Sequence, residues 1–140
     1  MQNPIKRDTK SIGDFSELMV LLALTEAGYD VSIPFGENHR YDMIADKDGV
    51  LSRVQVKTGR LRDGAVLFNC CSSHTHRNGK SRSYVGEIDY FGVYCPELRS
   101  VYLLPIQDTA RLNGTLRIRA TRNLQSKRRM TVSLSGKLPV

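Results

Sequence analysis

The chain has 140 residues, of which 40% are hydrophobic and 25% charged, with a formal net charge of +7. This length and composition allow one domain with a buried core and argue against global disorder. No run of about 18 apolar residues exists, and residues 1–12 lack an apolar stretch, so we expect no membrane span and no signal peptide. Three cysteines without an export signal argue against a disulfide framework, and the expected location is therefore cytoplasmic.

The first predicted element is a helix over residues 11–27. Ser11 can cap its N-terminus, and Gly28 can end it. Apolar residues run round most of its circumference, which predicts that the helix is buried in the core. Glu17 is an acid in the middle of this apolar stretch.

Strands are predicted along most of the remaining chain. Their expected ranges are 29–35, 41–45, 50–58, 65–71, 90–95, 101–106 and 116–118. A polar loop is expected over 72–83 and a helical turn over 107–112. These elements predict an α/β or α+β domain in which a mixed sheet packs on the buried N-terminal helix.

The charge is concentrated at the C-terminal end of the chain. Residues 1–110 hold 13 Lys and Arg and all 14 Asp and Glu, whereas residues 111–140 hold 8 Lys and Arg and no acid. A near-neutral body with a basic end favours a polyanionic partner, most often nucleic acid, because neutralising phosphates releases counterions. The alternative is a solvated basic tail.

A hairpin is predicted between the second and third strands. The pair Asp48-Gly49 is favoured in a two-residue type I′ turn, and this loop sets Lys47 opposite Val50.

Counting back along this hairpin places Asp42 opposite Gln55, with Cβ atoms about 5 Å apart. Because side chains alternate along a strand, Lys57 shares the face of Gln55. A four-residue loop would set Asp42 opposite Arg53 instead, and the faces would not change.

These side chains, with Glu17 on the adjacent helix, suit metal-assisted chemistry on a phosphate. Two carboxylates and an amide oxygen can hold Mg²⁺, a hard cation that prefers oxygen ligands. Lys57 can orient the attacking water and stabilise the charge that develops on the phosphate. The alternative is a solvated face with an Asp–Lys pair, which contributes little.

Three segments carry a family resemblance: Gly13-Asp14-Phe15-Ser16-Glu17, Tyr41-Asp42-Met43-Ile44 and Gln55-Val56-Lys57-Thr58. In this order and hairpin context they resemble the PD-(D/E)XK nucleases. The Gln-Val-Lys form is most similar to the branch that includes a group I intron homing endonuclease, and archaeal Holliday junction resolvases share a related layout. The resemblance covers about residues 12–106 and implies a restriction-endonuclease-like αβββ core.

The resemblance also implies a role for each matching residue. Asp42 corresponds to the central metal ligand, Glu17 to the helix acid that assists the metal site, and Lys57 to the catalytic lysine. The backbone carbonyl of Val56 corresponds to a further metal ligand. Gln55 stands where most members have Asp or Glu, so it removes one negative charge from the catalytic and metal-binding set and should weaken metal affinity.

The function implied by this resemblance is a Mg²⁺-dependent DNA endonuclease, with Mn²⁺ as a substitute. We expect site-specific double-strand cleavage of the homing-endonuclease type. Because one chain carries one site, a homodimer or tetramer is expected. The alternatives are a structure-selective Holliday junction resolvase and a non-catalytic DNA-binding module, which the loss of an acid at Gln55 leaves open. Residues 1–140 would form a single nuclease domain, with its core at about 12–106 and a basic segment at 111–140.

Basic and polar residues around this core are expected to contact double-stranded or branched DNA, with charged strand ends and a surface loop as the alternative. They are Lys10, Arg53, Thr58, Arg60, Arg77, Lys80, Arg82, Lys127, Arg128 and Arg129.

Zinc is not expected as a cofactor. Cys70 and Cys71 lie close to His74 and His76, but adjacent cysteines on a strand point to opposite faces, and no C-x₂-C spacing exists.

Overall fold

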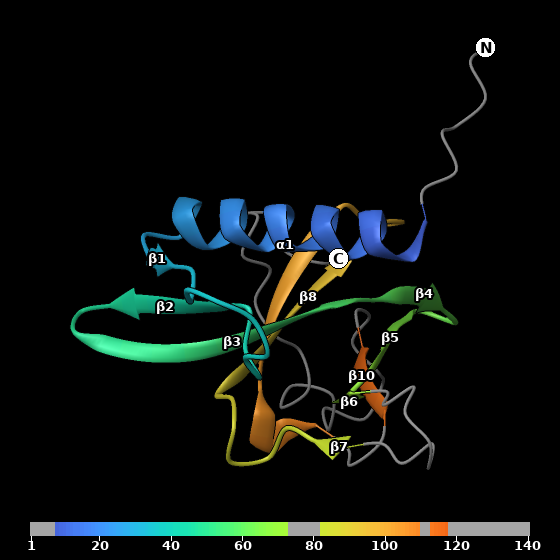
Figure 1. Cartoon of the computed structure of the whole chain (residues 1–140). Helices are drawn as coiled ribbons and strands as arrows, with labels where there is room; N and C mark the ends of the chain where they lie inside the picture. The colour runs from blue at the N-terminus through green and yellow to red at the C-terminus, as the bar shows by residue number, and fades with distance from the viewer. Residues whose placement is uncertain (1–7, 73–81, 110–112, 118–140) are drawn as a thin grey trace.

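A computed structural model describes residues 8–72, 82–109 and 113–117 of the chain. Figure 1 shows the helix lying across the strands. The elements in chain order are α1 (Thr9–Glu26), β1 (Asp30–Ser32), β2 (Met43–Lys47), β3 (Val50–Thr58), β4 (Arg60–Arg62), β5 (Ala65–Asn69), β6 (Cys71–Ser72), β7 (Arg82–Ser83), β8 (Tyr90–Cys95), β9 (Ser100–Pro105), the 3₁₀ turn η1 (Ile106–Asp108) and β10 (Asn113–Arg117).

The largest sheet has five strands in the order β1-β2-β3-β8-β9. The pairs β1–β2, β2–β3 and β8–β9 are antiparallel, whereas β3 and β8 run parallel. Helix α1 covers one face of this sheet (Figure 1). The predicted α+β architecture, a mixed sheet packed on an N-terminal helix, is confirmed.

Short strands occupy the connection between β3 and β8. Two of them, β4 and β5, form a small sheet with β10, which follows β9 in the chain, in the order β10-β5-β4, and β6 pairs with β7. The strand predicted over 65–71 is therefore two strands, because Asn69 accepts the N–H of Cys71 with its side chain and interrupts the ladder. The loop predicted over 72–83 begins and ends in strand residues, and β4 was not predicted at all.

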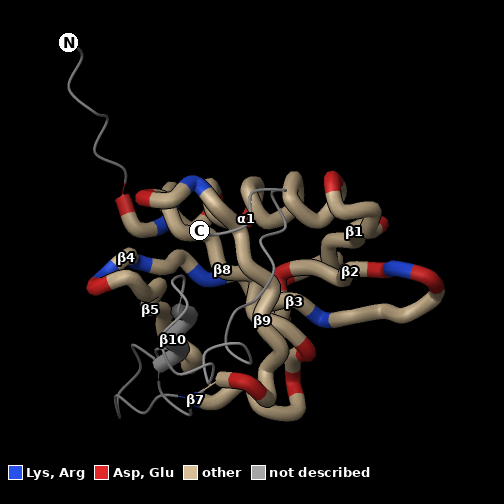
Figure 2. Tube along the Cα trace, turned by 180° about the vertical axis from the view of Figure 1, so that it is seen from behind, with Lys and Arg blue, Asp and Glu red and all other residues tan. Residues whose placement is uncertain are grey.

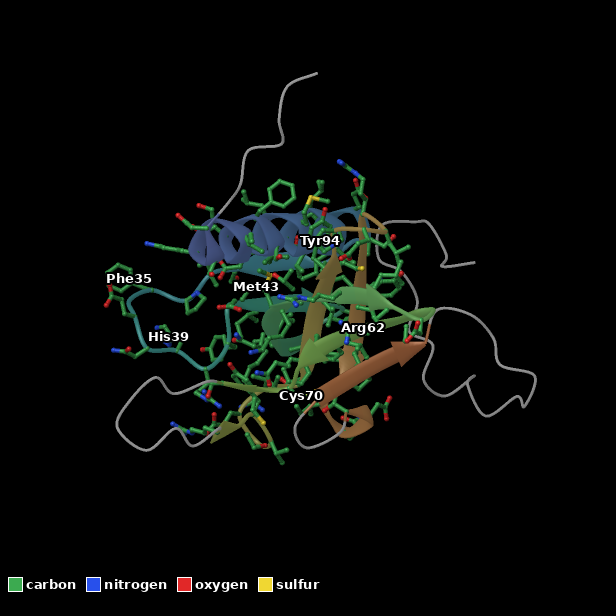
Figure 3. All side chains as sticks on the ribbon, turned by 90° about the vertical axis from the view of Figure 1, so that its right-hand side faces the viewer. Phe35, His39, Met43, Arg62, Cys70 and Tyr94 are labelled. Atoms are coloured by element: carbon green, nitrogen blue, oxygen red, sulfur yellow. The ribbon has the colours of Figure 1, made fainter. Side chains whose placement is uncertain are left out.

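The core lies on both faces of the large sheet. On the helix side, α1 packs against side chains that include Met43, Val54 and Tyr94. On the opposite side, β5 packs against side chains of β8 and β9, with Phe68 edge-on to Phe91. Figure 3 shows Met43 and Tyr94 near the helix and Cys70 on the far side of the sheet. The chain thus forms three layers: helix, large sheet and small sheets.

The N-terminus of α1 differs from the prediction. Asp8 is the N-cap, and its carboxylate accepts the N–H of Ser11 at 2.7 Å. Ser11 therefore lies inside the first turn. An ionised carboxylate satisfies a free helix N–H and also favours the positive end of the helix dipole, so Asp8 is the stronger cap.

Only one face of α1 is buried, although the sequence predicted burial round most of it. The buried residues are Ser16, Val20, Ala23 and Leu24. Leu18, in contrast, is 62% exposed. The reason is the layer order, because α1 contacts the large sheet on one side and the described chain places no layer on its other side.

Gly92 on β8 allows α1 to approach the sheet closely. A Cβ atom at this position would lie 2.8 Å from a methyl carbon of Val20 and 3.1 Å from one of Val54. Both distances are shorter than ordinary van der Waals contact. The absence of a side chain at Gly92 is therefore a condition for the packing of α1 on β3 and β8.

Of the two hairpin strands, β3 has the predicted bounds, whereas β2 begins and ends two residues later than the predicted 41–45. The bounds of β3 and β8 are those predicted, whereas β1 is shorter than the predicted 29–35 because Pro34 and Gly36, with φ of 89°, turn the chain. Within the described parts of the chain, no helix has the length and apolar character needed to cross a membrane.

Candidate active site

The β2–β3 hairpin has the register that the sequence predicts. Lys47 pairs with Val50, and the two loop residues Asp48 and Gly49 both have positive φ, 54° and 80°. Positive φ at both loop positions is the signature of a type I′ turn. The ladder ends at the pair Met43–Val54.

Asp42 lies directly before β2 and binds β3 with its side chain. Its N–H donates to the carbonyl of Val54 at 2.8 Å, and its carboxylate accepts the N–H of Val56 at 2.8 Å. The direct pairing predicted between Asp42 and Gln55 is therefore not formed. The carboxylate instead accepts the Val56 N–H, which would otherwise bond to a backbone carbonyl of a neighbouring strand. This hydrogen bond fixes the carboxylate beside the second half of β3.

Glu17 reaches the same point from α1. Partial desolvation together with the nearby charges of Asp42 and Asp14 raises the pKa of Glu17 to about 7, although much of the side chain is exposed. The neighbouring Ser16 is buried, and its hydroxyl lies 2.6 Å from that of Thr58 at the end of β3. This contact sets the position of α1, and hence of Glu17, relative to the hairpin.

Burial also raises the pKa of Asp42, even though the Val56 N–H and the Lys57 ammonium both favour its charged form. Two carboxyl groups within hydrogen-bond distance disfavour double ionisation unless a cation compensates. The pair Glu17 and Asp42 is thus a site of concentrated negative charge in partly desolvated surroundings.

Lys57 supplies the positive charge of the site. Burial lowers the pKa of its ammonium group, and the Asp42 carboxylate acts in the opposite direction. Its Nζ donates to the carbonyl of Cys71 and to the hydroxyl of Tyr84, each at 3.4 Å. The ammonium therefore lies against two oxygen atoms from the connection between β5 and β8.

Gln55 is half-buried and lies two residues before Lys57 on β3, so alternation places the two on the same face. Its Nε2 donates to the carbonyl of Val56 at 3.5 Å, which is a long contact. This amide leaves its own oxygen as a further candidate ligand.

The donor set consists of oxygen atoms: two carboxylates, the Gln55 amide and the Val56 carbonyl. Hard divalent cations prefer such ligands, so these residues fit Mg²⁺ or Mn²⁺ better than a soft metal. Among the residues that the structure describes, no three side chains of His, Cys, Asp or Glu come together at one point. The acids of the candidate site are Glu17 and Asp42.

The basic residues predicted to contact DNA are distributed differently. Arg53 binds the carboxylate of Asp89 and the carbonyl of Gly86, and Arg82 forms an ion pair with Glu87. Lys10 on α1 and Arg60 on β4 are exposed. The remaining predicted contacts lie outside the described residues: Arg77, Lys80, Lys127, Arg128 and Arg129.

Two residues beside Lys57 were missed by the sequence analysis. Tyr84 is only 4% exposed and contacts the Lys57 ammonium, and Arg40 stacks on the Tyr84 ring with its Cζ 4.0 Å from the ring centroid. Tyr84 follows a segment that was predicted as a polar loop, and Arg40 precedes a strand. The only signal in the sequence was a large aromatic residue at the end of that loop.

The two cysteines considered for zinc are both buried free thiols. Burial raises the pKa of Cys70 to about 11, which disfavours the thiolate that a metal needs. His74 and His76 lie outside the described residues.

The chain is similar to known proteins in both sequence and fold. Protein 5.3 of Escherichia phage T7 is 44% identical over 46 residues, which cover 33% of this chain and 39% of the phage protein. The structure of a bacterial homing endonuclease, I-Ssp6803I, superposes with a TM-score of 0.67 at 24% identity, covering 85% of this chain and 83% of that one. A profile of the PD-(D/E)XK endonucleases, nucleases that hydrolyse phosphodiester bonds and generally use divalent metals, matches residues 7–133. Since this match spans most of the chain, the protein belongs to the PD-(D/E)XK endonuclease family.

Proposed function

We propose that the chain is a Mg²⁺-dependent DNA endonuclease that makes site-specific double-strand cuts, as the homing endonucleases do. One observation carries this proposal: the Val56 N–H fixes the Asp42 carboxylate, which lies close enough to Glu17 to raise the pKa of that acid, while the Lys57 ammonium favours the charged form of Asp42. Two acids and a lysine, from α1, the residue before β2, and β3, are thus neighbours where β2 begins.

The cation would be held by the carboxylates of Glu17 and Asp42, the Gln55 amide oxygen and the Val56 carbonyl. A divalent cation supplies Lewis-acid stabilisation of the negative charge that develops on a phosphate under attack. Asp42 is prepared for this role because the Val56 N–H fixes its carboxylate before any ligand binds.

Lys57 would hold the attacking water and the scissile phosphate in position. A partly desolvated ammonium interacts more strongly with a phosphate oxygen than one in water does. Attack of the water on phosphorus breaks the bond to the 3′-oxygen, which leaves a 3′-hydroxyl and a 5′-phosphate.

The proposal includes a second copy of the chain, as a homodimer or tetramer. Cutting both strands of a duplex requires two sites of opposite orientation, and the chain carries one, so two-fold symmetry of the protein would match that of the DNA. The three free cysteines support a reducing, cytoplasmic setting.

The test is metal-dependent cleavage by the full chain. Supercoiled plasmid, linear duplex and a four-way junction are incubated with the protein in Mg²⁺ or in EDTA, alongside Asp42→Asn and Lys57→Ala. We expect cleavage in Mg²⁺ alone, and a rate at least about 100-fold lower in both variants, because each removes a group that stabilises the transition state.

Two control variants carry matched changes away from the site. Asp48→Asn keeps a residue that tolerates the positive φ of the hairpin turn, and Lys47→Gln removes an ammonium that binds the carbonyl of Ala27. Both should cleave at the wild-type rate.

The substrates separate the alternatives. If the four-way junction is cut preferentially, the proposed function of site-specific cleavage is wrong and the protein is a junction resolvase. Binding of DNA without cutting, and no heat of Mn²⁺ binding in calorimetry, would instead identify a non-catalytic DNA-binding module.

A further inference from the structure

Tyr84 contacts two cations beside the proposed active site. The side chain follows β7 and is 4% exposed. The Cζ of Arg40 lies 4.0 Å from the centroid of its ring, and the Nζ of Lys57 lies 4.9 Å from the same centroid. Both distances are within the range over which a cation is attracted to an aromatic face.

The ammonium of Lys57 depends on this neighbourhood for its hydrogen bonds. Besides the Tyr84 hydroxyl, it donates to the carbonyl of Cys71, and both acceptors belong to the connection between β5 and β8. Lys57 itself belongs to β3. The direction in which the lysine side chain points is therefore set by a different part of the chain from the one that carries it.

The Tyr84 ring is held on its other sides as well. Phe91 on β8 packs edge-on against it, with centroids 5.7 Å apart and planes at 89°. The stacked guanidinium of Arg40 is fixed by the hydroxyl of Ser72 and the carbonyl of Ser83, both at 2.9 Å, and by the carboxylate of Glu87. A ring fixed in this way presents its hydroxyl at a constant position.

We propose that Tyr84 is a positioning residue for Lys57. Its hydroxyl accepts a hydrogen bond from the ammonium and its ring attracts the ammonium charge, so that Nζ is aimed at the place where Asp42 lies. This inference rests on the proposed function in one respect, that Lys57 acts on the scissile phosphate. Both hydrogen bonds from the ammonium to its oxygen acceptors are long, which leaves Nζ free to move toward a substrate without first breaking a strong bond.

The experiment uses the full chain with Tyr84→Phe, which removes the hydroxyl and keeps the ring, and Tyr84→Leu, which removes both. Tyr102→Phe is the matched control, because Tyr102 is fully buried in the same core cluster but lies on β9, separated from β3 by β8. Thermal unfolding of each variant establishes that it is folded.

The first measurement does not require activity. In protein labelled with ¹⁵N-lysine, the ammonium signal of Lys57 is identified by its loss in Lys57→Arg. A hydrogen-bonded, partly buried ammonium exchanges its protons slowly and gives a distinct signal. We expect this signal to shift and weaken in Tyr84→Phe, to disappear in Tyr84→Leu and to stay unchanged in Tyr102→Phe.

The second measurement is the single-turnover cleavage rate, together with the Kd for the same DNA in EDTA. Tyr84→Phe should lower the rate about 10-fold, the effect of losing one hydrogen bond to a charged group, with Kd unchanged. An unchanged ammonium signal in both Tyr84 variants, or a changed signal with a wild-type rate, would overturn the positioning role. If wild-type protein cuts no DNA, the proposed function fails, and the spectrum alone still decides whether Tyr84 positions Lys57.

Discussion

Gln55 is the residue at which the proposed active site differs from the Asp or Glu that the family resemblance leads us to expect. An amide in place of a carboxylate offers an oxygen ligand without a charge, so the cation would be attracted by two acids rather than three. Glu17 and Asp42 would then carry most of the electrostatic attraction, and the raised pKa of Glu17 means that a bound cation must favour its charged form.

Gln55→Glu should therefore bind Mn²⁺ about 10-fold more tightly than the wild type, because it adds a charge next to the other ligands. Calorimetric titration with Mn²⁺ measures the change. Gln107→Glu, on the exposed turn η1, adds the same charge elsewhere and should leave the affinity unchanged. Equal affinities of Gln55→Glu and wild type would place Gln55 outside the metal site.

Asp89 links the strand that carries Lys57 to β8, since it accepts the N–H and two guanidinium N–H groups of Arg53. These bonds lower the pKa of Asp89 in the folded chain. A depressed carboxyl pKa stabilises the fold above the unfolded value of about 3.9, and this stabilisation is lost as the pH falls through the folded pKa.

Asp89→Asn should accordingly be less stable than wild type at pH 7 by about 1 kcal/mol, since the ion pair is partly exposed and screened. The difference should shrink toward zero as the pH falls below about 4. Urea unfolding at both pH values measures the two free energies. A difference that persists at low pH would mean that the contribution does not come from the charge of Asp89.

Some residues of the site could be predicted from a local sequence pattern, and others could not. Asp42 and Lys57 were predictable because an Asp-Gly turn fixes the hairpin register and alternation then assigns the faces. Arg40 and Tyr84 were not, because their contact with Lys57 depends on how the connection between β5 and β8 folds back on the sheet. No hydrophobic periodicity in the sequence predicts how this connection folds back on the sheet.

At the scale of elements, the packing of α1 on the sheet is the feature that brings Glu17 to Asp42. The close approach requires Gly92, where a Cβ would meet Val20 and Val54. Gly13, on α1, has open space around it, since no heavy atom lies within 4 Å of its Cβ position. Replacing each of these two glycines by alanine should therefore have opposite effects on stability.

Gly92→Ala should lower the free energy of unfolding by about 1–3 kcal/mol through overpacking. Gly13→Ala should raise it by up to about 1 kcal/mol, because alanine is the better helix former. Chemical denaturation measures both. We also expect Gly92→Ala to slow cleavage more than Gly13→Ala, since it moves α1 and Glu17. A neutral Gly92→Ala would show that α1 can shift without cost.

Elements with a strong local signal were predicted well, and elements defined by distant partners were not. The range of β3 follows from the Asp-Gly turn before it and the alternation of apolar and polar residues along it, and the range of β8 follows from an apolar run that ends before Pro96. The strand β4, in contrast, is an exposed three-residue segment whose pairing with β5 is its only strand feature. The one-sided burial of α1 was likewise invisible, because the number of layers around a helix is a property of the whole fold.

At the scale of the whole molecule, the excess of positive charge lies in a different part of the sequence from the residues of the proposed active site. Lys and Arg residues of the described body alternate with acidic ones along the trace (Figure 2), and several of them are neutralised by ion pairs with Asp89 and Glu87. Residues 111–140, in contrast, hold 8 basic residues and no acid. Nonspecific attraction to DNA should therefore come mainly from this C-terminal segment rather than from the body.

Replacing Lys127, Arg128 and Arg129 together by alanine tests this division of roles. Each phosphate contact contributes about 0.9 to the slope of log K against log salt concentration, so the slope should become shallower by about 2 to 3. Titrations of duplex DNA at several salt concentrations in EDTA measure it, with Lys47→Gln as a control that removes a charge from the β2–β3 hairpin and should leave the slope unchanged. Because these three residues lie outside the catalytic set, cleavage at saturating protein should continue. An unchanged slope in the triple variant would mean that the segment is a solvated tail and that the DNA is held by the body alone.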